Sequence, residues 1–260
     1  MRVASLAFGA FFLAIGAPSA AEAPQALNVC AASDLANSGE RVIACTDIIR
    51  SSQSYDAFLW RAAAYSELGN RAAAIADLTA AIKMAPGSAA AYGARGTLYL
   101  KDDEFRDGLV DLDRALALAP GDEATLRTRA FAWDSLRNYA GAIADYGALL
   151  ALTGDETYRY FRGFAYFHRG DDAAAIVDFD ATVDSDSPTL VAWAHRGRGR
   201  VYERQGALTA ALADYDAALA ADPSDDRAFA GRCRVRMALG GQGGDFAGCA
   251  GALRSDAGAL

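Results

Sequence analysis

Positive charge and histidine are both scarce in this sequence of 260 residues. Lys and Arg number 25 against 33 Asp and Glu, which gives a formal net charge of −8, and there are only 2 histidines, His168 and His195. An acidic chain lacks the basic surface that neutralises phosphates, so we expect no nucleic-acid partner. No serine-hydrolase, zinc-protease or phosphate-loop motif occurs either, so we expect no enzyme activity, no metal and no cofactor.

Proline is scarce as well, with 6 residues, whereas hydrophobic residues make up 53% of the chain and many of them are alanine. Alanine is the strongest helix former and proline the strongest helix breaker, so this composition favours closely packed helices around a sizeable core. Beyond the first segment of the chain there is no second long apolar run. We therefore expect a mature chain that does not span a membrane.

The first segment, residues 1–21, has the pattern of an export signal. Arg2 precedes an uncharged apolar stretch that ends at Ala17, and Ser19 and Ala21 occupy the two small-residue positions of a cleavage site. This pattern predicts cleavage near Ala21 and a periplasmic or secreted bacterial protein. An uncleaved membrane anchor is the alternative.

The rest of the chain repeats with a period of about 34 residues. Small and large apolar residues recur four and three residues apart within each unit, which marks one face of a helix. Glycines stand between two such stretches, where a helix end needs a positive φ. The period itself is carried by prolines that are expected to close their repeats, Pro86, Pro120, Pro188 and Pro223, and by the aromatic series Tyr65, Tyr99, Trp133, Tyr166 and Tyr202. Each unit is therefore predicted to be a helical hairpin that must stack on its neighbours.

This pattern resembles the tetratricopeptide repeat, for example in Ala94-Arg95-Gly96-Thr97-Leu98-Tyr99, and the resemblance covers roughly residues 23–253. It implies an all-α fold, a right-handed α-solenoid of about fourteen stacked helices. We expect a degenerate capping hairpin at 22–54, five repeats filling 55–225, and a degenerate repeat with a tail at 226–260. The five repeats are placed at 55–88, 89–122, 123–156, 157–191 and 192–225.

Four cysteines lie in the two terminal hairpins. Cys30 and Cys45 are 15 residues apart, and Cys233 and Cys249 are 16 apart. An even number of cysteines in an exported protein fits disulfides, so we predict Cys30–Cys45 and Cys233–Cys249, although four cysteines allow three pairings. Terminal repeats lack one neighbour, and a cross-link would offset part of that loss.

Two charged series keep the register of the repeat. Position numbers are counted from Tyr55, Ala89, Glu123, Glu156, Ala192 and Asp226 as position 1, so that position 7 is Arg in all six repeats and position 23 is Asp in the five full ones. We interpret them as structural pairs that join helices within or between units; a repeated charged surface is the alternative. The series are Arg61, Arg95, Arg129, Arg162, Arg198 and Arg232, with Asp77, Asp111, Asp145, Asp178 and Asp214.

The resemblance also implies a concave groove along the first helix of each hairpin. At its groove positions aromatic side chains adjoin arginines, the residue types most often found as binding hot spots. The candidate groove residues are Phe131, Tyr160, Phe164, Phe167, His168, Arg196, Arg200, Arg204, Arg227 and Arg234. The other interpretation of these residues is aromatic core packing and solvated arginines.

We therefore predict an interaction scaffold or adaptor that binds a protein or peptide with acidic and apolar residues. A self-associating structural repeat protein of the cell envelope, forming a homo-oligomer, is the first alternative. An enzyme or small-ligand-binding protein with a cryptic site is the second.

Overall fold

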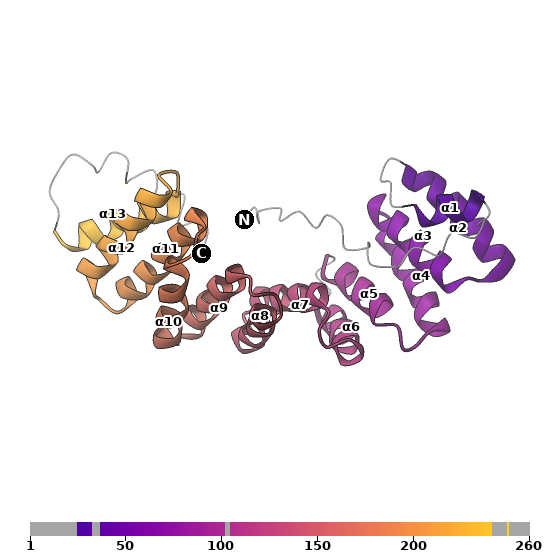
Figure 1. Cartoon of the computed structure of the whole chain (residues 1–260), viewed down its shortest axis with the longest axis horizontal. Coiled ribbons are helices and arrows are strands. Elements are labelled where there is room, and N and C mark those ends of the chain that lie inside the picture. The colour runs from indigo at the N-terminus through magenta and orange to yellow at the C-terminus, as the bar shows by residue number, and fades with distance from the viewer. Residues whose placement is uncertain (1–24, 33–36, 102–104, 241–248, 250–260) are drawn as a thin grey trace. The chain divides into compact units, whose positions relative to one another are not determined.

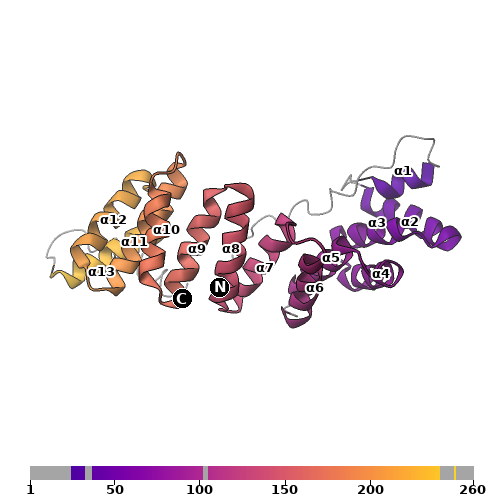
Figure 2. The ribbon, with the colours of Figure 1, turned by 60° about the horizontal axis from the view of Figure 1, so that its bottom comes forward.

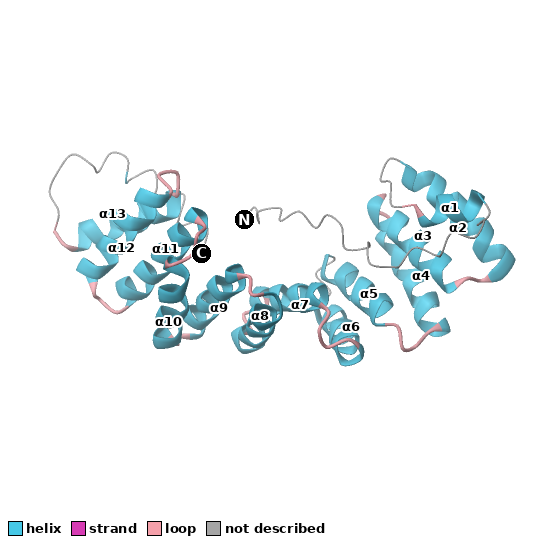
Figure 3. Cartoon of the chain, viewed as in Figure 1, coloured by secondary structure: helices cyan, strands magenta, loops and turns pink. Residues whose placement is uncertain are grey.

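The computed structural model describes residues 25–32, 37–101, 105–240 and 249. The expected signal segment at 1–21 and most of the expected last hairpin beyond Gly240 lie outside these residues. The described residues form thirteen α-helices joined by loops, with no strand among them (Figure 3). They belong to two compact units, one within Ser5–Ala132 and one within Trp133–Leu260, which we call the N-terminal and the C-terminal unit.

Consecutive helices pack on one another from α1 to α6 in the N-terminal unit and from α8 to α13 in the C-terminal unit (Figures 1 and 2). This confirms the predicted all-α solenoid architecture. The N-terminal unit contains α1 (Gln25–Ala31), α2 (Ser38–Ser52), α3 (Tyr55–Glu67), α4 (Arg71–Met84), α5 (Ala89–Lys101) and α6 (Phe105–Leu118), and α7 (Glu123–Ser135) crosses its boundary. The C-terminal unit contains α8 (Tyr139–Thr153), α9 (Glu156–Arg169), α10 (Asp172–Val183), α11 (Pro188–Arg204), α12 (Leu208–Ala221) and α13 (Asp226–Ala238).

Short polar residues begin the helices and left-handed residues separate the helices of a hairpin. The side chain of Ser54 accepts a hydrogen bond from the backbone of Ala57 at the start of α3, and Asp171 does the same for Ala174 at the start of α10. Pro188 was expected to close a repeat; instead it lies in the first turn of α11. Proline fits there because its missing N–H would have no partner in the first turn of a helix.

Small residues let neighbouring hairpins approach closely. A Cβ atom added to Gly197 in α11 would lie 2.7 Å from two ring carbons of Phe179 in α10. Phe179 is fully buried, so its ring has no room to move away. Alternation of small and large residues along the repeat is therefore what allows the helices to pack.

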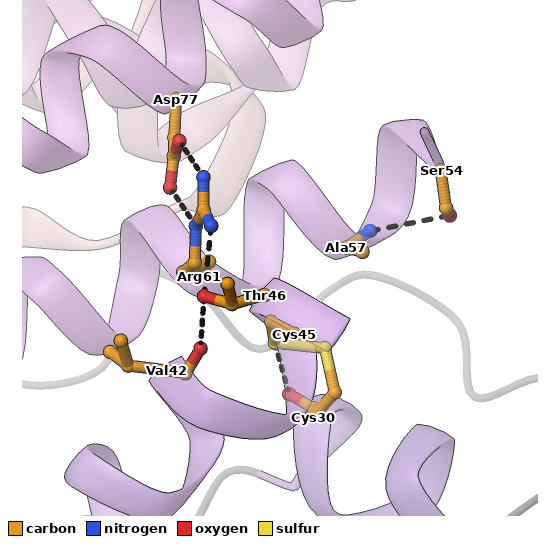
Figure 4. Close-up of a disulfide and its surroundings, with 8 residues drawn as sticks. All are labelled: Cys30, Val42, Cys45, Thr46, Ser54, Ala57, Arg61 and Asp77. Atoms are coloured by element: carbon orange, nitrogen blue, oxygen red, sulfur yellow. Dashed lines mark hydrogen bonds and ion pairs between the residues drawn. A yellow bond between two sulfur atoms is a disulfide. The ribbon is translucent and has the colours of Figure 1, made fainter. Parts of the chain in front are cut away.

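The arginine at position 7 of each repeat joins helices, as predicted for a structural pair. In Figure 4 the Arg61 guanidinium donates from Nε and Nη2 to the two carboxylate oxygens of Asp77, both at 2.7 Å, and from Nη1 to the Thr46 hydroxyl at 2.9 Å. Asp77 is in α4 and Thr46 in α2, so one side chain of α3 ties its own hairpin to the preceding one. The Asp77 hydrogen bonds raise the pKa of Arg61, although burial opposes this.

The same bidentate bridge recurs in the N-terminal and in the C-terminal unit. Its members are Arg95 with Asp111, Arg162 with Asp178, and Arg198 with Asp214, at distances from 2.6 to 2.9 Å. The link to the preceding hairpin also recurs, from Arg95 to Thr79, Arg129 to Asp113, Arg198 to Asp180 and Arg232 to Asp216.

The two predicted cysteine pairs lie at disulfide distance, one pair in each unit. Cys30 in α1 is joined to Cys45 in α2, with their Cα atoms 4.9 Å apart (Figure 4). Cys233 in α13 is joined to Cys249, with their Cα atoms 5.6 Å apart. All four are buried.

Candidate functional site

A cavity of about 740 Å³ opens in the C-terminal unit. Its walls come from the first helices of three successive hairpins, α9, α11 and α13, and from the turn before α8 together with the start of α8. The lining residues are Arg137, Tyr139, Phe164, Phe167, His168, Arg196, Arg200, Glu203, Arg204, Arg227 and Arg234. Eight of the ten candidate groove residues therefore lie around one cavity.

The two other candidates lie elsewhere. Tyr160 was expected to line the groove, but it is only 5% exposed and packs in the core against Phe164 and Trp193, with ring centroids 5.7 and 5.4 Å away. The large ring fits the space between hairpins, and its hydroxyl accepts a hydrogen bond from Arg196 at 3.1 Å. Phe131 belongs to the N-terminal unit, where 37% of it is exposed.

Arginines stacked on aromatic rings form one wall of the cavity. The Arg200 guanidinium lies 5.1 Å from the ring centre of Phe164 and 4.9 Å from that of Phe167. Arg204 lies 3.9 Å from the ring centre of Phe167 and donates a hydrogen bond to its backbone oxygen at 2.7 Å. Such stacking holds the guanidinium in place against the aromatic wall.

Acidic residues hold other arginines of the lining. Arg196, whose side chain is 11% exposed, is paired with Asp225, which is buried. Arg234 donates to Glu203 at 2.9 Å, and the Tyr215 hydroxyl donates to the same carboxylate at 2.7 Å. These contacts fix the floor of the cavity in one geometry.

The lining of the cavity is rich in positive charge. It contains six arginines and one acidic residue, Glu203, while Asp225 pairs with Arg196 and Asp172 pairs with Arg204. On a chain of net charge −8, this is a local excess of positive charge facing a concave wall.

His168 lies among these charges. Its ring stacks on Tyr139 at 5.4 Å between centroids and lies 5.1 Å from Phe164. Burial by the cavity walls, and then repulsion by Arg200, Arg137 and Arg204, lower the pKa of His168 to about 4. The imidazole is therefore neutral near pH 7.

Arg137 reaches the cavity from an unfavourable backbone conformation. Its φ is 58°. It occupies position 15 of its repeat, and the residues at position 15 of three other repeats, Gly69, Gly170 and Gly206, have φ between 75° and 90°. A side chain in the left-handed region costs about 1–2 kcal/mol, which glycine avoids. Arginine at this position therefore places a cation in the cavity lining at a cost in backbone strain.

Sequence reasoning missed Arg137, Tyr139 and Glu203. The first two lie outside the first helices, on which the groove was expected. Glu203 occupies a groove position, but the search favoured aromatic and basic side chains there. Arg137 could have been recognised because its repeat has no glycine at position 15.

The remaining titratable features belong to the framework. His195 lies 3.0 Å from Asp214, inside the Arg198–Asp214 bridge, and not in the cavity. Over the described ranges, no group of three or more His, Cys, Asp or Glu side chains is placed to hold a metal. No helix in the same ranges is both long and apolar enough to cross a membrane.

Consecutive helical hairpins with a cavity on their first helices define an α-solenoid repeat protein. Models of the tetratricopeptide repeat match residues 55–88 and 178–226, and the first of these ranges coincides with the first full unit predicted from the period. The chain is therefore a tetratricopeptide-repeat protein.

Solved structures of such proteins share the fold. YrrB, described as a tetratricopeptide-repeat protein with an unusual peptide-binding site, is 19% identical with a TM-score of 0.64, covering 72% of this chain and 97% of that one. The C-terminal part of a repeat protein from Cytophaga hutchinsonii is 14% identical with a TM-score of 0.62, covering 79% and 90%. MamA is 18% identical with a TM-score of 0.53, covering 66% and 92%. No curated protein matches the chain.

Proposed function

We propose that the protein is an exported adaptor whose C-terminal unit binds a partner segment rich in carboxylates and apolar side chains. The observation that carries the proposal is the cavity itself, whose lining places six arginines beside an aromatic wall on an acidic protein. Tetratricopeptide repeats support an interaction scaffold, and the cavity supplies the chemistry of recognition.

The size of the cavity favours a short segment as the ligand. A volume of about 740 Å³ lies in the range of sites that enclose a few side chains. Carboxylates of the segment would meet guanidinium edges, since planar arginine bonds carboxylate bidentately. Its apolar side chains would cover Phe164 and Phe167. That YrrB has a peptide-binding site supports the use of this fold for such a ligand.

Export is supported by two features of the sequence that bear on the same compartment. The first is the signal-like pattern of residues 1–21, and the second is the pairing of all four cysteines, which an oxidising compartment maintains. Amino-terminal sequencing of the protein recovered from a periplasmic fraction should begin at Glu22. An amino terminus at Met1 in a membrane fraction would favour the anchor instead.

Binding is tested with a panel of nonapeptides in which Leu alternates with Glu, Gln or Lys. Fluorescence anisotropy should show that the Glu peptide binds at least tenfold more tightly than the Lys peptide. Arg227→Glu, a change of an exposed lining residue, should weaken binding of the Glu peptide about tenfold or more.

Arg106→Glu is the matched control, because Arg106 is exposed on α6 in the N-terminal unit and the change in net charge is the same. Equal weakening by both variants would show general charge attraction and would contradict a site in the cavity. If no peptide is preferred and light scattering shows a mass that rises with concentration, self-association replaces the proposal.

A further inference from the structure

His168 is a neutral imidazole placed among cations and aromatic rings in the lining of the cavity. Every element around it contributes positive charge or a ring. The turn before α8 contributes Arg137, α8 contributes Tyr139, and α11 contributes Arg200 and Arg204, while its own helix contributes Phe164 and Phe167.

The carboxylates of this region are already engaged by other groups. Glu203 accepts hydrogen bonds from Arg234 and from the Tyr215 hydroxyl. Asp172 is paired with Arg204. An imidazolium at His168 would therefore meet three arginines, and the acids of the described residues near it are bound elsewhere.

We propose that an acidic peptide entering the cavity brings a proton onto His168, so that the site holds this ligand more tightly as the pH falls. The inference rests on the proposed function, because it takes the same cavity and the same ligand class. It adds a coupling between ligand and proton that a site built of arginines alone would lack.

The coupling follows from simple electrostatics. A ligand carboxylate neutralises the field of Arg137, Arg200 and Arg204 at the imidazole and offers it an acceptor, and both effects favour the protonated form. Burial of the ring by the ligand opposes this, but a paired charge tolerates burial far better than an isolated one. Together, these effects predict that the pKa of His168 rises from about 4 when peptide is bound.

The size of the effect follows from linkage. If bound peptide restores the ordinary histidine pKa of about 6.5, affinity rises about tenfold between pH 7.5 and pH 5.5. The peptide's own glutamates do not produce this change, because with pKa values of about 4.3 they stay ionised above pH 5.5. Arginines do not titrate in this range either.

The test uses NMR, which resolves histidine rings one by one. The chain has 2 histidines, so His195→Gln leaves His168 as the only signal to follow. The probe is the acetylated and amidated Leu–Glu nonapeptide at saturation. We expect the His168 ring to titrate well below pH 6 in the free protein and at least one pH unit higher in the complex.

Affinity gives the second measurement on the full chain. Wild type should bind the peptide about tenfold more tightly at pH 5.5 than at pH 7.5, whereas His168→Gln should bind it equally at both values. Calorimetry in two buffers of different ionisation enthalpy should show proton uptake only for wild type.

The outcomes separate the two proposals. If the peptide binds and the His168 titration does not move, the proton coupling is overturned and the adaptor proposal stands. If the peptide does not bind at any of these pH values, the adaptor proposal fails and the coupling fails with it.

Discussion

The N-terminal and C-terminal units share one framework and differ in what they present on the first helices. At position 9 of those helices the N-terminal unit has Ala63 in α3 and Thr97 in α5, whereas the C-terminal unit has Phe164, Arg200 and Arg234 in α9, α11 and α13. The bridge from position 7 to position 23 is unchanged, as Arg61–Asp77 in one unit and Arg162–Asp178 in the other.

This difference separates the residues that make the fold from those that make the site. Positions facing a neighbouring helix keep a fixed residue type along the array, because the packing distance is the same at every joint. Positions facing the groove lie outside the bridge, and their contacts differ from joint to joint, as Arg200 stacks on Phe164 and Arg234 bonds to Glu203. These positions can therefore be small in one unit and aromatic or cationic in the other. The contrast predicts that changes to the framework act alike in both units, and that changes to the groove act in one.

The largest expected effect comes from breaking the bridge in each unit by Asp111→Ala and by Asp178→Ala. Each aspartate is at most 4% exposed, so its removal leaves a largely buried guanidinium without its bidentate partner. We expect a loss of about 3 kcal/mol or more of unfolding free energy in both variants, measured by urea denaturation. A much smaller loss in one unit would show that the frameworks are not equivalent.

The matched control replaces both partners, as in Arg162→Met with Asp178→Leu. Apolar side chains of similar volume leave no unpaired charge, so most of the lost stability should return. If the double variant were as unstable as Asp178→Ala, shape rather than charge pairing would be the contribution of the bridge.

Removing the terminal cross-links should have the next largest effect. Cys30→Ser with Cys45→Ser, and Cys233→Ser with Cys249→Ser, each open a loop of about 15 residues, which the chain-entropy model values at roughly 3 kcal/mol. Thermal denaturation should show both losses. Only the second pair should also weaken peptide binding, because α13 carries Cys233 together with Arg227 and Arg234 of the cavity. Equal binding by both variants would contradict this distinction.

The smallest effect is expected at position 15, and it has opposite signs in the two units. Arg137→Gly should raise the unfolding free energy by up to about 1 kcal/mol, because it removes left-handed strain, while weakening peptide binding. Gly69→Arg in the N-terminal unit should lower the unfolding free energy by a similar amount and leave peptide binding unchanged. Chemical denaturation and anisotropy on the same samples check both. A stabilised Arg137→Gly variant with full affinity would remove Arg137 from the site.

The fold could be predicted from the sequence because the framework repeats. Five copies of the same small, large, arginine and aspartate positions fix the period, and the period fixes the hairpins. Pro188 shows the limit of this reasoning. The sequence around a proline does not distinguish a proline that follows one helix from a proline in the first turn of the next. The structure shows that Pro188 begins α11.

The site was harder to predict because it does not repeat. Position 5 is Tyr160 in one hairpin and Arg196 in the next, and the two bond to each other, so the ring goes inward to accept from the guanidinium. The inward orientation of Tyr160 depends on its contact with Arg196 in the next hairpin, so it cannot be predicted from the sequence of one repeat alone. Arg137 depends on a turn that departs from the glycine rule, which a search for regular features passes over.

The bridging arginine has a consequence for how such a chain can grow. Among the described residues, the arginines of five hairpins reach back to the hairpin before them, where acceptors such as Thr46, Thr79 or Asp180 receive them. Duplication of one period in the gene therefore inserts a hairpin whose two joints are complete at once. Arrays of this kind can change length in a single genetic event, and the new copy is then free to acquire its own groove.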